Sequence, residues 1–259
     1  DKAAFMTAAK LGNSVGVSES TVVRFAIELG FSGYPSLQKS LQELIKNKLT
    51  TVQRLDLSND YICNGYTLKG VLKSDMENIR ATMEKINYST FEDVVNNIFE
   101  AKRIYIIGLR SSMALAEFLG FYLNVILQNV KTVGYGISDI FEEMINIGEG
   151  DLVIGIGFPR YANRTIDVLS FAQDRGATIV ALTDSIISPL AQRADYALIV
   201  QSNMASFVDS LVAPLSVINA LLIAVGLRQK ESVSTTFNSL EEIWKEYNVY
   251  SYNHNNDEF

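Results

Sequence analysis

The chain has 259 residues and a formal net charge of −7, and its length allows one large domain or two modest domains with a sizeable core. Its 48% hydrophobic and 20% charged residues are the balance of a globular protein and exclude intrinsic disorder. The single cysteine, Cys63, excludes an internal disulfide and favours a reducing compartment, so we expect the protein in the cytoplasm.

No apolar stretch has the length of an uninterrupted membrane span, so we predict no membrane partner. The closest candidate, residues 211–227, contains Pro214, Ser216 and Asn219 and is better explained as a buried helix, because a span needs about 18 apolar residues in a row. The start of the chain has no signal-peptide pattern. Asp1 stands in place of an initiator methionine, which suggests that an upstream piece is missing.

Charge is distributed unevenly along the chain. Residues 1–50 contain six basic and four acidic side chains, a balance of +2, which leaves −9 for residues 51–259. A mildly basic head on an acidic body predicts a polyanionic partner for the head alone.

The first fifty residues are predicted to form a helix-turn-helix domain. Their apolar residues recur at helical spacing, and Thr7 and Ser18 are expected to cap two successive helices. Gly12 would let these helices approach closely, and Gly16 would make the turn between them.

The second of these helices is predicted to lie in the major groove of DNA. Val22 and Phe25 are expected to pack it on the first helix. The side chains left for base edges and phosphates are Ser18, Glu19, Ser20, Thr21 and Arg24. An alternative explanation is a helical hairpin used for dimerisation, with Arg24 on a solvated face.

After the head the periodicity changes. Residues 51–84 are predicted to form a linker and a connecting helix. Residues 85–246 alternate helical stretches with five short apolar runs, at 103–108, 130–134, 151–157, 177–183 and 196–200. This alternation is typical of a parallel sheet buried on both faces, so we predict an α/β, doubly wound, flavodoxin-like fold with five strands. The polar tail, 247–259, is expected to be flexible.

The carboxyl ends of the strands are where a doubly wound sheet binds ligands, and hydroxyl and guanidinium groups follow several of them. The predicted ligand-binding residues are Gly108, Arg110, Ser111, Ser112, Ser138, Gly157, Arg160, Tyr161, Arg164, Thr165 and Thr183. Together with the helix N-termini that follow the strands, these groups suit a phosphorylated, polyhydroxylated ligand.

The loop after the third strand contains the cation best suited to such a ligand. Gly157 and Pro159 restrict its path, so Arg160 would be held in place and could grip a phosphate or a carboxylate with two parallel hydrogen bonds. The sequence leaves a second explanation open, in which Arg160 pairs with an acidic residue at a subunit interface.

The head resembles the N-terminal domain of the RpiR family of bacterial transcription regulators. The family motif has a Val-Ser-x-x-Thr-Val-x-Arg-Phe core and a Leu-Gly-Phe-x-Gly-Tyr/Phe segment. The matching residues are Val17, Ser18, Thr21, Val22, Arg24, Phe25, Leu29, Gly30, Phe31, Gly33 and Tyr34. The resemblance implies binding to operator DNA, with Tyr34 as a further contact. It also implies a first helix upstream that this chain lacks.

Residues 85–230 resemble the SIS (sugar isomerase) domain, which follows this head in the family. Ser112 matches the serine of the domain's first loop. SIS enzymes carry a Ser-x-Ser-Gly-x-Thr loop where this chain has 157–161, a form found in the regulators. The resemblance therefore implies a sugar-phosphate sensor that is a homodimer or homotetramer and binds a near-palindromic operator.

A SIS-type sugar-phosphate isomerase is the alternative from another class. It would need a base for the C2 proton, and Glu142 and Glu143 are the candidates that the sequence leaves open, since His254 lies in the tail. The sequence contains no metal-ligand cluster, Walker loop or dinucleotide fingerprint, so we expect no cofactor, no metal and no catalytic residue. A pure interaction protein is the third alternative.

Overall fold

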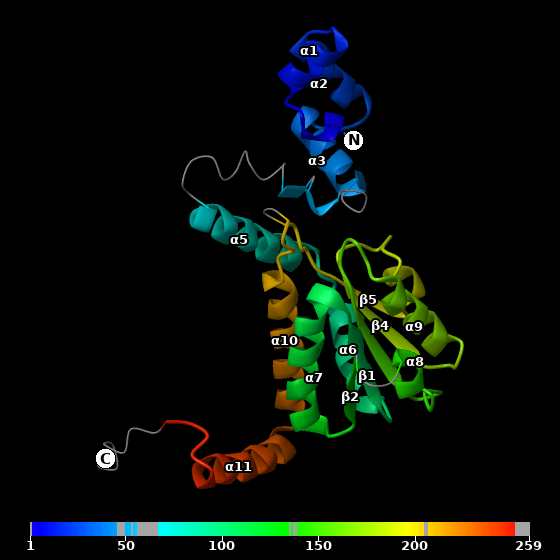
Figure 1. Ribbon diagram of the computed structural model, residues 1–259, viewed down its shortest axis with the longest axis vertical. Coiled ribbons are helices and arrows are strands. Elements are labelled where there is room, and N and C mark those ends of the chain that lie inside the picture. Colours follow the sequence, from blue (N-terminus) through cyan, green and yellow to red (C-terminus); the bar gives the residue numbers. More distant parts are fainter. Residues whose placement is uncertain are drawn as a thin grey trace. The chain divides into compact units, whose positions relative to one another are not determined.

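The computed structural model describes residues 2–45, 50–52, 54–55, 67–134, 136, 139–204 and 207–251 (Figure 1). The chain divides into two compact units. The first contains Asp1–Ser74 and Asn203–Ser210, and the second contains Asp75–Ser202 and Leu211–Phe259. Each unit has a hydrophobic core of its own.

The first unit begins with short helices. A 3-10 helix, Lys2–Phe5, is followed by α1 (Ala8–Val15), α2 (Glu19–Glu28) and α3 (Tyr34–Ile45). Thr7 accepts a hydrogen bond from the Lys10 N–H and Ser18 accepts one from the Thr21 N–H, so both act as the predicted N-caps. Gly16 has a left-handed φ of 77°, which confirms the predicted turn.

The core of this unit consists of Val22, Ala26, Tyr34 and Leu37. Gly12 is buried where an added Cβ would lie 2.7 Å from the carbonyl oxygen of Val17, so the close approach of the two helices requires a glycine. Val22 packs as predicted, but the prediction for Phe25 is wrong. Phe25 is 57% exposed, because Val22 and Ala26, one turn apart, occupy the inner face of α2.

The second unit contains a sheet of five parallel strands, which confirms the predicted fold class. The strands are β1 (Ile104–Gly108), β2 (Val130–Val133), β3 (Leu152–Ile156), β4 (Thr178–Thr183) and β5 (Tyr196–Ile199). Their spatial order is β2-β1-β3-β4-β5, with every pair parallel. The order reverses between β1 and β3, which is the switch point of a flavodoxin-like sheet.

Helices cover both faces of this sheet (Figure 1). On one face lie α6 (Tyr88–Glu100), α7 (Met113–Leu127) and α10 (Val212–Arg228), and on the other lie α8 (Ile140–Glu143) and α9 (Asn163–Gln173). The remaining helices are α5 (Thr67–Lys85), α11 (Lys230–Glu246) and two 3-10 helices, Arg110–Ser112 and Ala191–Arg193.

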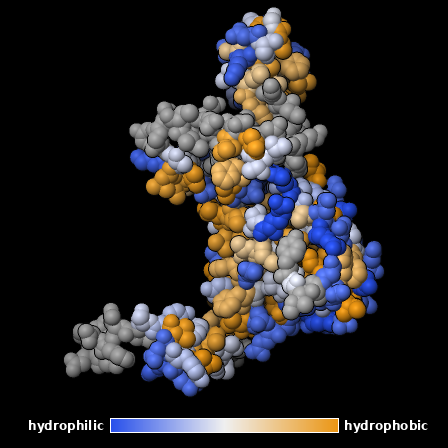
Figure 2. All heavy atoms as spheres, in the orientation of Figure 1, coloured by the Kyte–Doolittle hydropathy of each residue, from blue (hydrophilic) through white to orange (hydrophobic). Residues whose placement is uncertain are grey.

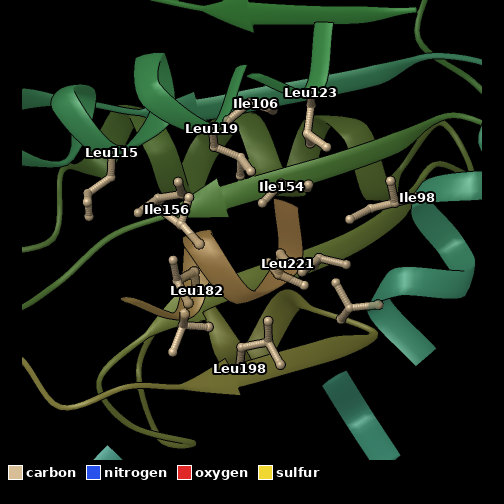
Figure 3. Close-up of a cluster of buried hydrophobic side chains, with 14 of the residues drawn as sticks. Ile98, Ile106, Leu115, Leu119, Leu123, Ile154, Ile156, Leu182, Leu198 and Leu221 are labelled. Carbon is tan, nitrogen blue, oxygen red and sulfur yellow. The ribbon is translucent and has the colours of Figure 1, made fainter. Parts of the chain in front are cut away.

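Residues that alternate along the strands fill two separate cores, because neighbouring side chains of a strand point to opposite faces. Ile106 belongs to the core under α7 and α10, and Ile107 belongs to the core under α8 and α9. Figure 3 shows the first core, where Ile154 lies among leucines such as Leu119 and Leu221. This burial on both faces explains why the central strands β1, β3 and β4 are nearly continuous apolar runs in the sequence.

Within the described residues, no single helix combines the length and hydropathy of a membrane span. The helices Val212–Arg228 and Val233–Glu246 have the length and composition of a membrane span only when they are taken together, and the chain bends by 106° between them. Seven residues of α10 are buried inside the second unit, as the sequence predicted for this segment.

β1 ends at Gly108, where the following loop turns back closely over the strand. An added Cβ at Gly108 would lie 2.6 Å from the carbonyl oxygen of Ser112 and 3.2 Å from the Cβ of Ala116. Backbone atoms cannot swing aside as the end of a flexible side chain can. The path of residues 109–112 therefore depends on this glycine.

We expect Gly108→Ala to lower the free energy of unfolding of the second unit by about 1–3 kcal/mol, because the added methyl group overpacks the loop. The matched control is Gly226→Ala in α10, where an added Cβ meets no other described segment within 4 Å. There the higher helix propensity of alanine should raise stability by up to about 1 kcal/mol. Urea unfolding followed by circular dichroism measures both changes, and equal effects would contradict the role of Gly108.

Candidate functional site

The predicted ligand-binding residues follow the ends of β1, β3 and β4. Gly108 is paired with Ile156, and Ile156 with Leu182, so the segments after these three strands begin side by side. The switch point between β1 and β3 is the place where doubly wound sheets bind ligands. Ser138, predicted from the loop before α8, lies outside the described residues.

Arg110 and Arg160 both have a left-handed backbone, with φ angles of 59° and 67°. They are two of the four described residues other than glycine that have a positive φ, and they follow β1 and β3. This conformation costs such a residue about 1–2 kcal/mol, and strain of this kind concentrates at functional sites. Both arginines are exposed, so their side chains are accessible at the switch point.

The loop after β3 is anchored by its first residues. The Gly157 N–H donates to the Leu182 carbonyl at 3.1 Å, which continues the hydrogen bonding of β3 with β4. Phe158 is 5% exposed and belongs to the core under α10. An added Cβ at Gly157 would lie 2.8 Å from the side chain of Leu190. These contacts hold the loop in place at Gly157 and Phe158, just before Arg160.

α9 begins at the end of this loop without a side-chain cap. Its N-cap residue is Ala162, which has no side-chain acceptor for the first N–H groups of the helix. Thr165, in the first turn, is 1% exposed, and its hydroxyl has no hydrogen-bond partner among the described residues. A buried hydroxyl left unpaired costs about 1–3 kcal/mol. Both features indicate a place for a ligand that accepts hydrogen bonds.

Asp184 belongs to the same edge, although it is not among the predicted residues. Its Oδ1 accepts a hydrogen bond from the Tyr161 hydroxyl at 2.7 Å and one from the buried Thr183 hydroxyl at 3.4 Å. The structure thus brings Tyr161 and Thr183 together through a shared carboxylate. The position of Asp184 directly after an apolar strand was the only sequence signal for it.

Arg164 makes an ion pair with the start of α8, at 2.8 Å from its Nη2 to Asp139 Oδ2, and about half of each side chain is exposed. The two carboxylates that the sequence left open as catalytic bases also have partners. Glu142 accepts from the Asp139 N–H in a capping box that starts α8, and Glu143 lies 3.3 Å from the ammonium group of Lys131. These contacts give both glutamates structural roles.

In the first unit, α2 presents a separate polar surface. Ser18, Glu19, Ser20 and Arg24 are exposed, and Thr21 is partly buried. Besides capping the helix, the Ser18 hydroxyl shares hydrogen bonds with the hydroxyls of Ser20 and Thr21, at 2.9 and 2.8 Å. These short hydroxyl groups and one guanidinium have the size and chemistry to reach base edges and phosphates.

Tyr34 is not part of this surface, and the prediction that it contacts DNA is wrong. It is 2% exposed, and its hydroxyl donates to the carbonyl oxygens of Ala3 and Met6 at 3.2 and 2.8 Å. Burial raises the pKa of its hydroxyl. Tyr34 therefore ties α3 to the start of the chain.

In the part of the chain that the structure describes, no three His, Cys, Asp or Glu side chains are grouped so that they could hold a metal ion. Cys63 and His254 lie outside that part. An open groove between α7 and β2, lined in part by Phe121 and Lys131, shares no residue with the edge where β1, β3 and β4 end.

Comparisons with known proteins match two separate stretches of the chain. Residues 1–48 match the helix-turn-helix domain of the rpiR family, and residues 97–224 match the SIS domain. An HTH-type transcriptional regulator of Haemophilus influenzae is 28% identical over 195 residues, which cover 73% of this chain and 66% of that regulator. The chain thus spans just under two thirds of this relative's length.

Two solved structures share the fold. The sugar isomerase domain of an RpiR transcription factor from Sphaerobacter thermophilus is 29% identical, with a TM-score of 0.66, and the match covers 68% of this chain and 99% of that one. NanR of Vibrio vulnificus, solved in complex with ManNAc-6P, is 19% identical, with a TM-score of 0.61 and coverage of 95% and 88%. With an rpiR-type helix-turn-helix followed by a SIS domain, this chain belongs to the RpiR family of transcriptional regulators.

Proposed function

We propose that this protein binds operator DNA through α2 and senses a phosphorylated sugar at the carboxyl ends of β1 and β3. The observation that carries the proposal is the set of unsatisfied groups at the start of α9. Ala162 leaves the helix uncapped, and the buried Thr165 hydroxyl has no partner among the described residues. A phosphate group would accept hydrogen bonds from both, and the exposed Arg160 could neutralise its charge.

The sugar itself would lie toward β4 and β1. The Asp184 carboxylate, oriented by Tyr161, can accept hydrogen bonds from sugar hydroxyls, and Ser112 adds a hydroxyl from the loop after β1. NanR of Vibrio vulnificus was solved with a sugar phosphate, ManNAc-6P, which supports this class of ligand for the related fold. Arg110, Ser111, Gly157 and Thr183 complete the proposed site.

Ligand binding can change DNA binding only if the ligand has different affinities for two arrangements of the protein. We infer a homodimer or homotetramer in the cytoplasm, in which two heads bind a near-palindromic operator. In this proposal the sugar phosphate shifts the balance between an arrangement that fits the operator and one that does not.

The alternative is a sugar-phosphate isomerase, because the SIS fold is shared with proteins described as such enzymes. The contacts of Glu142 and Glu143 favour the sensor, since both carboxylates have structural partners. Turnover of an aldose or ketose phosphate that disappears in Glu142→Gln or Glu143→Gln would establish the enzyme instead.

Arg24→Ala should weaken DNA binding about 10-fold, because the change removes a cation from the exposed face of α2. Fluorescence anisotropy at fixed, moderate salt measures the affinity for a duplex selected from random sequences with the intact protein. Arg80→Ala is the control, since Arg80 lies on α5 and its side chain is also exposed. An unchanged DNA affinity in Arg24→Ala would contradict the proposed docking of α2 on DNA.

Arg160→Ala should abolish the response to the sugar phosphate and leave DNA binding intact. A panel of sugar phosphates is screened by thermal shift, and the compound with the largest shift is titrated by calorimetry. The loss should exceed about 10-fold in affinity, since a charge-assisted pair to phosphate is removed. Arg164→Ala, which removes an ion pair with Asp139, should have the smaller effect. Wild-type ligand affinity in Arg160→Ala would remove this arginine from the site.

Thr165→Val should act in opposite directions on stability and on ligand binding. The valine fills the same space without a buried, unpaired hydroxyl, so the ligand-free protein should gain about 1 kcal/mol in its free energy of unfolding. The same change should weaken sugar-phosphate binding, because the hydroxyl is a proposed ligand contact. Ser170→Val on the same helix is the control, since the Ser170 hydroxyl already bonds Ile166 and Arg193. A Thr165→Val protein that is less stable would show that the hydroxyl has a partner.

A further inference from the structure

The segment 203–210 connects two elements of the second unit but clusters with the first unit. It follows β5 and precedes α10, so it leaves the sheet at the carboxyl edge, where the parallel strands β1, β3 and β4 also end. Its contacts nevertheless group it with Asp1–Ser74. The described part of the segment contains no helix or strand. This stretch therefore continues the chain of the sheet into the packing of the first unit.

The chain just before this segment is attached to α5 by a polar contact. The Gln201 N–H donates to the Thr82 hydroxyl at 2.9 Å, and Thr82 and Asn78 are the buried residues of that helix. Apolar side chains of α5 lie on its surface instead, as Figure 2 shows near the start of the helix, and Leu68 and Met76 are largely exposed. A hydrogen bond of this kind is directional, so it fixes the path of the chain where the segment begins.

Near its other end the segment makes an ion pair with the linker that follows α3. Arg54 Nη1 lies 3.3 Å from Asp209 Oδ1, and both residues belong to the first unit. Their side chains are 3% and 21% exposed, so both charges are largely removed from water. A buried ion pair adds little net stability, because the cost of desolvation offsets most of the attraction. Its best-attested use is to specify one arrangement of the chain.

The short helical turn that carries Arg54 is packed through its charged side chain. The Arg54 N–H donates to the Thr50 carbonyl at 3.0 Å, which closes the turn. Among the described residues of 50–55, Arg54 alone is buried, whereas Val52 and Leu55 are exposed. Burial of apolar side chains therefore does not explain how this turn is held, and the guanidinium of Arg54 does.

We propose that the Arg54–Asp209 pair is a latch through which sugar-phosphate binding at the carboxyl edge of the sheet changes operator binding by the head. In one arrangement the latch is closed, and the linker is held to the segment after β5. In the other arrangement the latch is open, and the linker is released. The inference rests on the proposed sensor function and adds the contact that transmits the ligand signal.

The place of the latch in the chain suits this role. Asp209 lies three residues before Val212, where α10 begins, and the buried face of α10 is part of the core on one side of the sheet. A shift of the strand ends or of α10 would therefore move Asp209 as well. A buried ion pair is either made or broken, because neither charge is stable when it is buried alone, so a small shift produces two distinct states.

The experiment measures how strongly ligand binding and operator binding are coupled in the full chain. The probe is whichever of glucose 6-phosphate, fructose 6-phosphate and ribose 5-phosphate gives the largest thermal shift. Operator affinity is measured by fluorescence anisotropy with and without saturating probe. The ratio of the two affinities should be about 5-fold or more in the wild type and below about 2-fold in Arg54→Met. Both sites should still bind, because neither contains Arg54.

Asp209→Asn is the second variant, since it keeps the shape of the side chain and removes its charge. If both residues act through one pair, the double variant should lose no more coupling than either single variant. Arg103→Met is the matched control. Arg103 also pairs with a buried aspartate, Asp151, at 2.7 Å, but the two residues precede β1 and β3 at the opposite edge of the sheet. This control should keep the wild-type ratio.

Hydrogen exchange of the wild-type protein tests the latch without any substitution. Exchange in peptides that cover 50–55 and 203–210 should change together by about 5-fold or more when the probe is added, because opening of the latch exposes both segments. Unchanged exchange in both segments would overturn the latch even if the variants fail to fold.

Two further outcomes separate the latch from the sensor function. A coupled wild type whose Arg54→Met and Asp209→Asn variants keep the full ratio would overturn the latch and leave the proposed sensor intact. A wild type whose operator affinity is unchanged by every probe would contradict the sensor function, and the latch with it.

Discussion

The parallel pairing of β1 with β3 is the interaction on which the rest of the second unit depends. It places Gly108 beside Ile156, so the two loops that turn away in opposite directions start from adjacent strand ends. Parallel strands must return through crossovers, and these crossovers supply the helices that bury both faces of the sheet. The same geometry brings the ends of β1 and β3 together at the switch point, which is the place where doubly wound sheets bind ligands.

At that edge the structure carries features that a well-packed fold usually avoids. Arg110 and Arg160 have a left-handed backbone conformation, which is unfavourable for any residue that has a side chain. In addition, α9 lacks a capping side chain, and the Thr165 hydroxyl is buried without a partner among the described residues. Each costs stability in the ligand-free protein. Their concentration in two neighbouring loops is the physical reason to regard this edge as a binding site. By contrast, the carboxylates of Glu142 and Glu143 already have partners in the fold, the Asp139 N–H and the Lys131 ammonium group.

Features set by short-range interactions could be predicted from the sequence. The caps Thr7 and Ser18 bond N–H groups only three residues away, and Gly16 needs only its own backbone freedom. The central strands β1, β3 and β4 could be found because burial on both faces demands nearly unbroken apolar runs. Phe25 and Tyr34 show where this reasoning fails. An aromatic residue inside a family motif can serve packing or binding, and only the neighbours that surround it decide between exposure at 57% and burial at 2%.

The sequence by itself therefore determined the helical head and the five-stranded parallel sheet, because periodicity and capping act between near neighbours in the chain. Only the tertiary structure decided which polar groups are already paired. The ion pair of Arg164 with Asp139 joins residues 25 positions apart, and the bond of Tyr161 to Asp184 joins residues 23 apart. It likewise decided that the side chain of Arg54 is buried beside Asp209, 155 positions further along the chain. Contacts of this kind depend on how the crossovers pack, which no local pattern records.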